Sequence, residues 1–137
     1  MSQTATLIIA ASEVDANLYY ATKFLAPDPF IFIVITNTKM LVMNDLEIDR
    51  ARSTATVDTV LSYSKYEKKA KSGGTTSPRM VDIVHLILQE HAVTKILVPG
   101  NFAFRHARDL QELGYVIETK DEPFYEQRLL KSDEEVQ

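Results

Sequence analysis

Runs of branched and aromatic residues alternate along this chain with longer stretches that mix apolar and polar positions. The runs have the length of β-strands, and the longer stretches place apolar residues at helical spacing. The expected strands are residues 5–11, 30–36, 39–45, 56–64, 95–100 and 115–120. A short polar pair, Asn37 and Thr38, joins the second run to the third and predicts an antiparallel hairpin.

The intervening stretches predict helices over residues 12–25, 44–55, 78–91 and 101–114. Residues 65–78 predict the tail of a short helix that runs into a mobile, glycine-bearing loop. The strongest pattern is that of 78–91, whose wide apolar face is formed by Met80, Val81, Ile83, Val84, Ile87 and Leu88. Because Ile87 lies with Ile83 and Val84 on one side of this helix, we expect it to be fully buried.

Residue types at the ends of these stretches predict where the helices begin and end. Ser77 is expected to cap helix 78–91, with Pro78 as its first residue. Asn44 or Asp45 is expected to cap helix 44–55, and Gly114 to close helix 101–114.

The order of these elements predicts an α/β fold. The second half reads strand, helix, strand, helix, strand, which favours parallel pairing with crossover helices. The hairpin in the first half makes the sheet mixed. We therefore expect one domain over residues 1–120, built on a mixed sheet of five to six strands with helices on both faces.

Composition narrows the class of protein. The 137 residues suit one domain, and the net charge of -4 argues against a general nucleic-acid binder, which needs a surplus of cations. No cysteine is present, so a reducing compartment is expected and thiolate metal sites are excluded. No stretch has the length or flanks of a signal peptide or a membrane span, and we expect a cytoplasmic protein without membrane contact.

No catalytic or metal-binding set is recognisable in the sequence. His85, His91 and His106 lack ligand spacing and are expected to be surface or half-buried helix residues. Charges three residues apart predict two surface ion pairs on helix 44–55, Glu47 with Arg50 and Asp49 with Arg52. The alternative for Arg50 and Arg52 is a binding role. The proline-fixed loop from Lys23 to Phe30 is a candidate contact surface.

The end of the chain carries a capping box. Ser132 precedes Glu135 by three residues, with Asp133 and Glu134 where a helix dipole favours negative charge. Only Val136 and Gln137 follow, which is less than one turn of helix. A helix start with no helix behind it is expected to belong to a second domain.

Two sets of residues resemble the N-terminal domain of the creatinase/prolidase family, the Xaa-Pro dipeptidases and aminopeptidases of the pita-bread metallopeptidase group. The helix after the first strand matches the family's pattern, with Lys23 where a glycine is expected; the matching residues are Asn17, Tyr20, Thr22 and Phe24. The C-terminal stretch matches the junction to the family's catalytic domain at Arg128, Lys131, Ser132, Glu135 and Val136. The resemblance covers essentially the whole chain.

The resemblance implies a ribonuclease H-like fold for 1–120, with 121–137 as the linker and first turn of an absent C-terminal catalytic domain. That domain would hold two divalent metal ions, such as Mn or Zn, and hydrolyse the bond before proline; this chain would hold no metal and no catalytic residue. Whether the chain belongs to an active enzyme depends on residues beyond Gln137, because the family includes dipeptidases, aminopeptidases, creatinase-like and inactive members.

The resemblance also implies partners: the chain's own catalytic domain, a second copy in a homodimer, and a proline-containing peptide. The N-terminal domain would wall the active site, and the residues expected to form its lip are Phe24, Asp28, Phe30, Arg50 and Arg52. The alternative is a free-standing α/β ligand-binding or protein-interaction module. Such a module is expected to carry an acidic cluster or a glycine fingerprint at its strand ends, and the sequence has neither.

Overall fold

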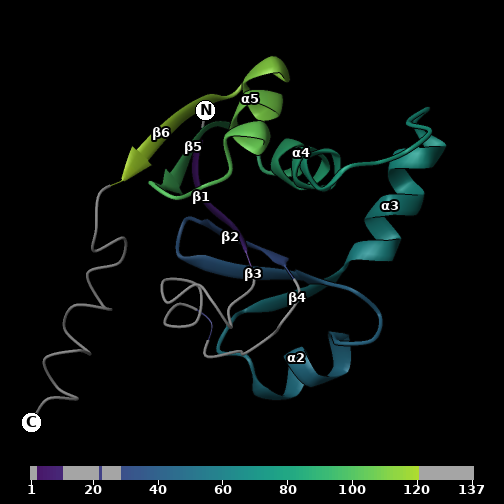
Figure 1. Cartoon of the computed structure of the whole chain (residues 1–137). Coiled ribbons are helices and arrows are strands. Elements are labelled where there is room, and N and C mark those ends of the chain that lie inside the picture. The colour runs from purple at the N-terminus through teal and green to yellow at the C-terminus, as the bar shows by residue number, and fades with distance from the viewer. Residues whose placement is uncertain (1–2, 11–21, 23–28, 121–137) are drawn as a thin grey trace, which may run out of the picture.

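One mixed six-stranded sheet organises the domain (Figure 1). The computed structural model describes residues 3–10, 22 and 29–120. The strands are β1 (Gln3–Ala10), β2 (Phe30–Ile35), β3 (Thr38–Met43), β4 (Thr59–Ser62), β5 (Val93–Pro99) and β6 (Val116–Lys120). The helices are α2 (Ile48–Thr54), α3 (Tyr63–Ser72), α4 (Met80–Glu90) and α5 (Phe104–Glu112). The mixed α/β sheet expected from the sequence is confirmed.

Five of the six strands run in the same direction. The strand order is β4-β3-β2-β1-β5-β6, and β2 is antiparallel to both of its neighbours, while β3–β4, β1–β5 and β5–β6 pair in parallel. The carboxyl ends of β1, β3, β4, β5 and β6 therefore meet at one edge of the sheet, called here the carboxyl edge. Parallel pairing of β5 with β6 through α5 confirms the second of the two crossovers predicted for the second half, whereas β4 pairs with β3 and not with β5.

The hairpin between β2 and β3 turns one residue earlier than expected. Thr36 and Asn37 have φ values of 48° and 67°, and Ile35 pairs with Thr38. Two consecutive residues at positive φ are typical of the two-residue turns that match the twist of a hairpin. The predicted hairpin is confirmed, and the predicted turn pair of Asn37 and Thr38 is wrong by one position.

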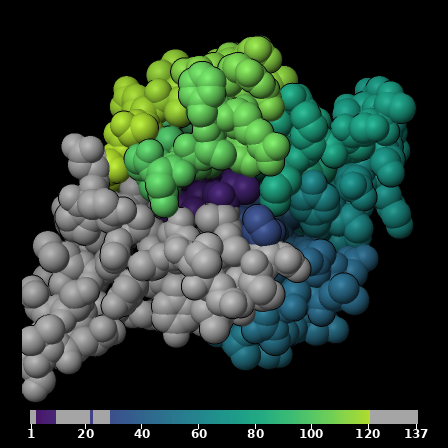
Figure 2. Space-filling model, viewed as in Figure 1, coloured from purple at the N-terminus to yellow at the C-terminus, as the bar shows by residue number. Residues whose placement is uncertain are grey.

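Alternation along the strands divides the buried residues between the two faces of the sheet. Leu7, Ile31 and Ile33 pack against α3, α4 and α5 in the larger core, whereas Ile8, Phe32 and Leu41 pack with Ala51 of α2 on the opposite face. Figure 1 shows these helices on the two sides of the sheet, and in Figure 2 α3 and the residues after it project from the body of the domain. The prediction of helices on both faces of the sheet is confirmed.

The best-patterned helix begins two residues later than predicted. α4 starts at Met80, because the carboxylate of Asp82 accepts a hydrogen bond of 2.8 Å from the backbone N–H of Arg79. The prediction that Ser77 caps this helix and Pro78 opens it is therefore wrong. The predicted burial of Ile87 is confirmed, since its side chain is 0% exposed.

Among the other boundaries that differ from the prediction, two have a cause that the hydrogen bonds show. β4 is confined to Thr59–Ser62, because the hydroxyl of Ser62 accepts the backbone N–H of Lys65 at 3.2 Å and starts α3 there. Asn44 accepts the N–H of Glu47 at 2.9 Å and closes a turn, so that α2 starts at Ile48 rather than at 44. The predicted helix 12–25 and the C-terminal stretch 121–137 lie outside the described residues, apart from Thr22.

Within the described ranges, no helix is long and apolar enough to cross a membrane.

Candidate functional site

A small polar network lies at the carboxyl edge, where β3 and β4 end. The carboxylate of Asp45 accepts hydrogen bonds from the hydroxyl of Ser64, at 3.0 and 3.1 Å, and from that of Ser62 at 3.4 Å. The two hydroxyls are 3.1 Å apart. A serine nucleophile needs a neighbouring general base such as histidine, whereas these hydroxyls face a carboxylate at the start of α3. The network therefore fixes the entry into α3 and has the composition of a helix cap.

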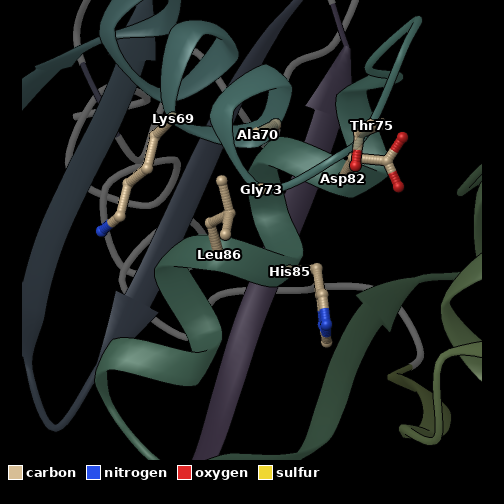
Figure 3. Close-up of a pocket in the computed structure, with 7 residues that line it drawn as sticks. All are labelled: Lys69, Ala70, Gly73, Thr75, Asp82, His85 and Leu86. Atoms are coloured by element: carbon tan, nitrogen blue, oxygen red, sulfur yellow. The ribbon is translucent and has the colours of Figure 1, made fainter.

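A cavity of about 120 Å³ lies between α3 and α4 (Figure 3). Its polar side chains do not meet: in Figure 3, Leu86 lies between Lys69 and His85, and Asp82 lies beside Thr75. The two charged side chains have partners outside the cavity, since Lys69 pairs with Glu90 at 3.1 Å and Asp82 with Arg79 at 3.1 Å. His85 is within 2.7 Å of the Tyr115 hydroxyl. These side chains hold elements together and are not aimed at a common point.

A second cavity, of about 230 Å³, lies between the first turns of α4 and α5. Arg79 spans it, pairing with Asp82 at 3.1 Å and with Asp109 of α5 at 3.2 Å. The hydrogen bond from Arg79 lowers the pKa of the Asp82 carboxyl. Burial, with Arg105 nearby, lowers the pKa of His106 and favours its neutral form. Arg79 is thus paired with carboxylates of both helices, and these ion pairs hold α4 and α5 together.

The ends of α3 and α4 are joined by a third polar cluster. The Tyr66 hydroxyl donates to Glu90 at 2.9 Å, and Lys69 lies 5.7 Å from the centre of the Tyr66 ring. Burial and the hydrogen bond to Glu90 raise the pKa of Tyr66 to about 12. The phenol therefore stays protonated at neutral pH and does not act as a general base.

The two-metal centre implied by the resemblance does not fit the residues described. Across residues 3–10, 22 and 29–120, no group of three or more His, Cys, Asp or Glu side chains could hold a metal ion. Two metals of that kind need several carboxylates and an imidazole around one point. We derive no metal-dependent step for this domain.

The structure places three of the five expected lip residues. Phe30 opens β2 and is 3% exposed in the smaller core, so its side chain contributes to packing. Arg50 and Arg52 are exposed on α2, and the Nε of Arg50 donates to Glu47 at 2.7 Å, which confirms the first predicted ion pair. Asp49 and Arg52 form no ion pair in the part of the chain described here. Phe24 and Asp28 lie outside the described residues.

Three polar contacts in this region were not predicted from the sequence, and they differ in whether a local pattern indicates them. Arg79 and Asp82 are three residues apart, the spacing that identified Glu47 with Arg50, so the pattern was available. The contacts of Arg79 with Asp109 and of His85 with Tyr115 join residues 30 positions apart. Such contacts depend on how α4 and α5 pack together, and no local pattern predicts them.

Solved structures with the same fold include Xaa-Pro peptidases. The X-Pro aminopeptidase from Thermotoga maritima MSB8 superposes with a TM-score of 0.64 at 11% identity, over 86% of this chain and 31% of that chain. The creatinase/prolidase N-terminal domain of an X-Pro dipeptidase from Streptococcus pyogenes gives 0.57 at 14% identity, over 87% of both chains. The X-prolyl aminopeptidase from Caenorhabditis elegans, described as a cytosolic enzyme with a di-nuclear active site, gives 0.56 at 12% identity, over 85% of this chain and 20% of that chain.

These likenesses concern the fold. No family model matches the sequence, and no curated protein matches it. The chain spans less than a third of the Thermotoga and Caenorhabditis peptidases, but most of the isolated Streptococcus domain. The chain therefore has the fold of the creatinase/prolidase N-terminal domain.

Proposed function

We propose that this chain is the non-catalytic N-terminal domain of a metallopeptidase of the Xaa-Pro dipeptidase or aminopeptidase kind. The observation that carries the proposal is a difference in coverage. The match to an isolated N-terminal domain covers 87% of this chain and 87% of that domain, whereas the match to an X-Pro aminopeptidase covers 86% of this chain and only 31% of that chain. The rest of such a protein would be the catalytic domain that binds and cleaves the peptide.

The proposed role of the domain is to wall the active site and to support a homodimer. The described polar clusters favour this role over catalysis, because their side chains pair with one another and brace helices. Arg50 and Arg52 on α2 give the domain exposed cations that suit a peptide carboxylate. The N–H of Thr56 donates to the carbonyl of Thr22 at 2.6 Å, so the chain just after α2 lies beside the residue that precedes the candidate loop 23–30.

The metal ions belong, in this proposal, to the catalytic domain. The Caenorhabditis neighbour is described as a cytosolic enzyme with a di-nuclear active site. By analogy, the parent of this chain would use two divalent ions such as Mn or Zn to activate water, and would work in the cytoplasm on proline-containing peptides. The described part of this chain would contribute shape and charge around the substrate.

The first test is to read the gene beyond the codon for Gln137. The proposal expects about 250 further residues, a common size for one large domain, that contain two Asp, one His and two Glu as metal ligands. A gene that ends at this point, or that continues into an unrelated domain, would contradict the proposal. The free-standing interaction module would then be the better account.

The second test compares the long protein with this chain under identical conditions. With Mn²⁺, the long protein should hydrolyse Xaa-Pro peptides, whereas the 137-residue chain should not. In the long protein, Arg52→Ala should raise KM for peptides with a free carboxylate, and Lys68→Ala, an exposed cation on α3, is the matched control. Equal effects of the two substitutions on KM would remove Arg52 from the proposed lip.

A further inference from the structure

β6 forms one of the two lateral borders of the sheet (Figure 1). In the part of the chain that the structure describes, β5 is its only neighbouring strand, and the two pair in parallel from Val116 to Lys120 of β6 without a register shift. The backbone N–H and C=O groups of β6 that point away from β5 therefore face no strand of the described fold. A row of such groups is a template for pairing with another strand.

Proteins block open strands of this kind with prolines, bulges or charged side chains. β6 reads Val-Ile-Glu-Thr-Lys, so it contains no proline, and its pairing with β5 shows no bulge. Val116 at its start is 56% exposed. The groups that restrict pairing are therefore the two charges, Glu118 and Lys120, and their signs decide which strand β6 accepts.

Glu118 and Lys120 are two residues apart and lie on the same face of the strand. Both side chains are exposed. Glu118 pairs with Lys95 of β5 at 2.9 Å, whereas Lys120 has no acidic partner among the described residues. This face of β6 thus presents a carboxylate with one cation beside it and a second cation that is free to bind a carboxylate from another chain.

A negative and a positive charge two residues apart are self-complementary in an antiparallel pair. If two copies of β6 meet with the two-fold axis at Thr119, Glu118 of each copy lies opposite Lys120 of the other, and the two Thr119 residues face each other. Directly opposite charges and paired threonines both stabilise a sheet. An axis at Glu118 would instead place two carboxylates opposite each other, which is destabilising. The charges therefore favour a second copy of this strand, in one register.

We infer that the chain forms a two-fold homodimer in which the β6 strands of two copies pair antiparallel about Thr119 and join the two sheets into one. Glu118 then lies between Lys95 of its own copy and Lys120 of the other. The inference specifies the homodimer that the proposed function includes, and it rests on that function only for the role of the dimer. A monomeric chain would refute the inference and leave the reading of the gene beyond Gln137 as the test of the peptidase role.

A cysteine on the two-fold axis tests both the pairing and its register. The sequence contains no cysteine, so Thr119→Cys introduces a single thiol per chain. Residues directly opposite in an antiparallel pair have Cα atoms about 4.5–5.5 Å apart, which is within the range of a disulfide. With oxidised glutathione, Thr119→Cys should give a covalent dimer at least tenfold faster than Val116→Cys, the matched control. Val116 is exposed on the same strand but lies three residues from the axis. Equal rates for the two variants would overturn the inference.

Sedimentation equilibrium of charge variants gives a second, independent readout. Lys120→Glu places two acids opposite each other and should raise the Kd of the dimer at least tenfold. Glu118→Lys combined with Lys120→Glu restores opposite signs across the pair and should return the Kd to near the wild-type value. Lys71→Glu, at an exposed lysine on α3, makes the same change in net charge and should leave the Kd unchanged.

Three results of the sedimentation experiment would overturn the inference. The first is a wild-type chain that stays monomeric up to millimolar concentration. The second is assembly beyond the dimer, which a closed two-fold pair does not allow. The third is an equal effect of Lys120→Glu and Lys71→Glu, or a double variant that does not regain the dimer, because either outcome would remove the pairing of Glu118 with Lys120.

Discussion

The hydroxyl of Tyr115 lies 2.7 Å from Nδ1 of His85 and joins the middle of α4 to the residue that precedes β6. The same hydroxyl is 3.5 Å from the backbone carbonyl of His85, and the two rings meet edge to face with centroids 5.6 Å apart. Tyr115 is 8% exposed, and burial raises the pKa of its phenol. One ring nitrogen of His85 is therefore occupied by a structural hydrogen bond.

Replacing Tyr115 with Phe removes this bond and keeps the ring. We expect the free energy of unfolding to fall by about 1 kcal/mol, because a half-buried imidazole nitrogen loses its partner. Tyr63→Phe is the control, since the Tyr63 ring is half-buried and its hydroxyl makes no hydrogen bond in the described part of the chain; this change should cost less than about 0.5 kcal/mol. Urea unfolding of both variants measures the difference, and equal costs would mean that the bond does not form in solution.

The core position of Ile87 predicts a larger effect. Ile87 is 0% exposed on the face of α4 that packs against the sheet, and Ile87→Ala should reduce the free energy of unfolding by about 2–5 kcal/mol. Its neighbour Leu86 is only half-buried, so Leu86→Ala should cost clearly less. Denaturant midpoints decide this; an unchanged midpoint for Ile87→Ala would refute the packing of α4 described above.

Glycine is required after α5 for a conformational reason. Gly114 has a φ of 105°, and a Cβ added there would meet no atom within 4 Å, so any cost of Gly114→Ala comes from the backbone alone. We expect that cost to be about 1–2 kcal/mol. Gly100 is the control, because it has equal space and no positive φ. Thermal unfolding of both variants measures the difference. If Gly100→Ala destabilises the domain as much as Gly114→Ala, the positive φ of Gly114 does not cause the loss of stability.

Asp82 predicts a pH dependence of stability. The hydrogen bond from Arg79 lowers the pKa of this carboxyl in the folded state. The stability that the carboxylate contributes is therefore fully present above its unfolded pKa of about 4, and it is lost as the pH falls through the folded pKa. Asp82→Ala should cost about 1 kcal/mol at pH 7. The difference in unfolding free energy from wild type should stay constant from pH 7 to 5 and shrink below pH 4. Asp49→Ala, at an exposed carboxylate on α2, serves as control; a difference for Asp82→Ala that grows below pH 4 would contradict the assignment.

Local patterns in the sequence account for most of the fold. Two runs of branched and aromatic residues, 30–36 and 39–45, predicted the hairpin, and the wide apolar face around Ile83, Val84 and Ile87 predicted the helix that covers the larger core. Those signals work because burial selects apolar residues: continuously along a strand covered on both faces, and at period 3.6 on a helix that buries one face. The errors in the fold were at element boundaries. Ser77 and Pro78 fit the start of a helix, but the carboxylate of Asp82 accepts the backbone N–H of Arg79, and α4 therefore starts at Met80.

Long-range relationships could not be predicted in the same way. Nothing local indicates that β1 lies between β2 and β5, or that Arg79 reaches Asp109, because these contacts arise only when α4 and α5 pack on the finished sheet. The candidate lip shows the same limit. Arg50 was identified by its spacing from Glu47, whereas the burial of Phe30 follows from its place as the first residue of a central strand.

The proposed function assigns the catalytic centre to another domain and none to this one. The most direct measurement is calorimetric titration of the chelator-treated 137-residue chain with MnCl₂ and with ZnCl₂, followed by an assay for Xaa-Pro hydrolysis in the same solutions. The account predicts only weak binding, without a stoichiometric site, and no hydrolysis above the uncatalysed rate. One metal ion bound per chain with a submicromolar Kd, or turnover that follows the chain through purification, would contradict it.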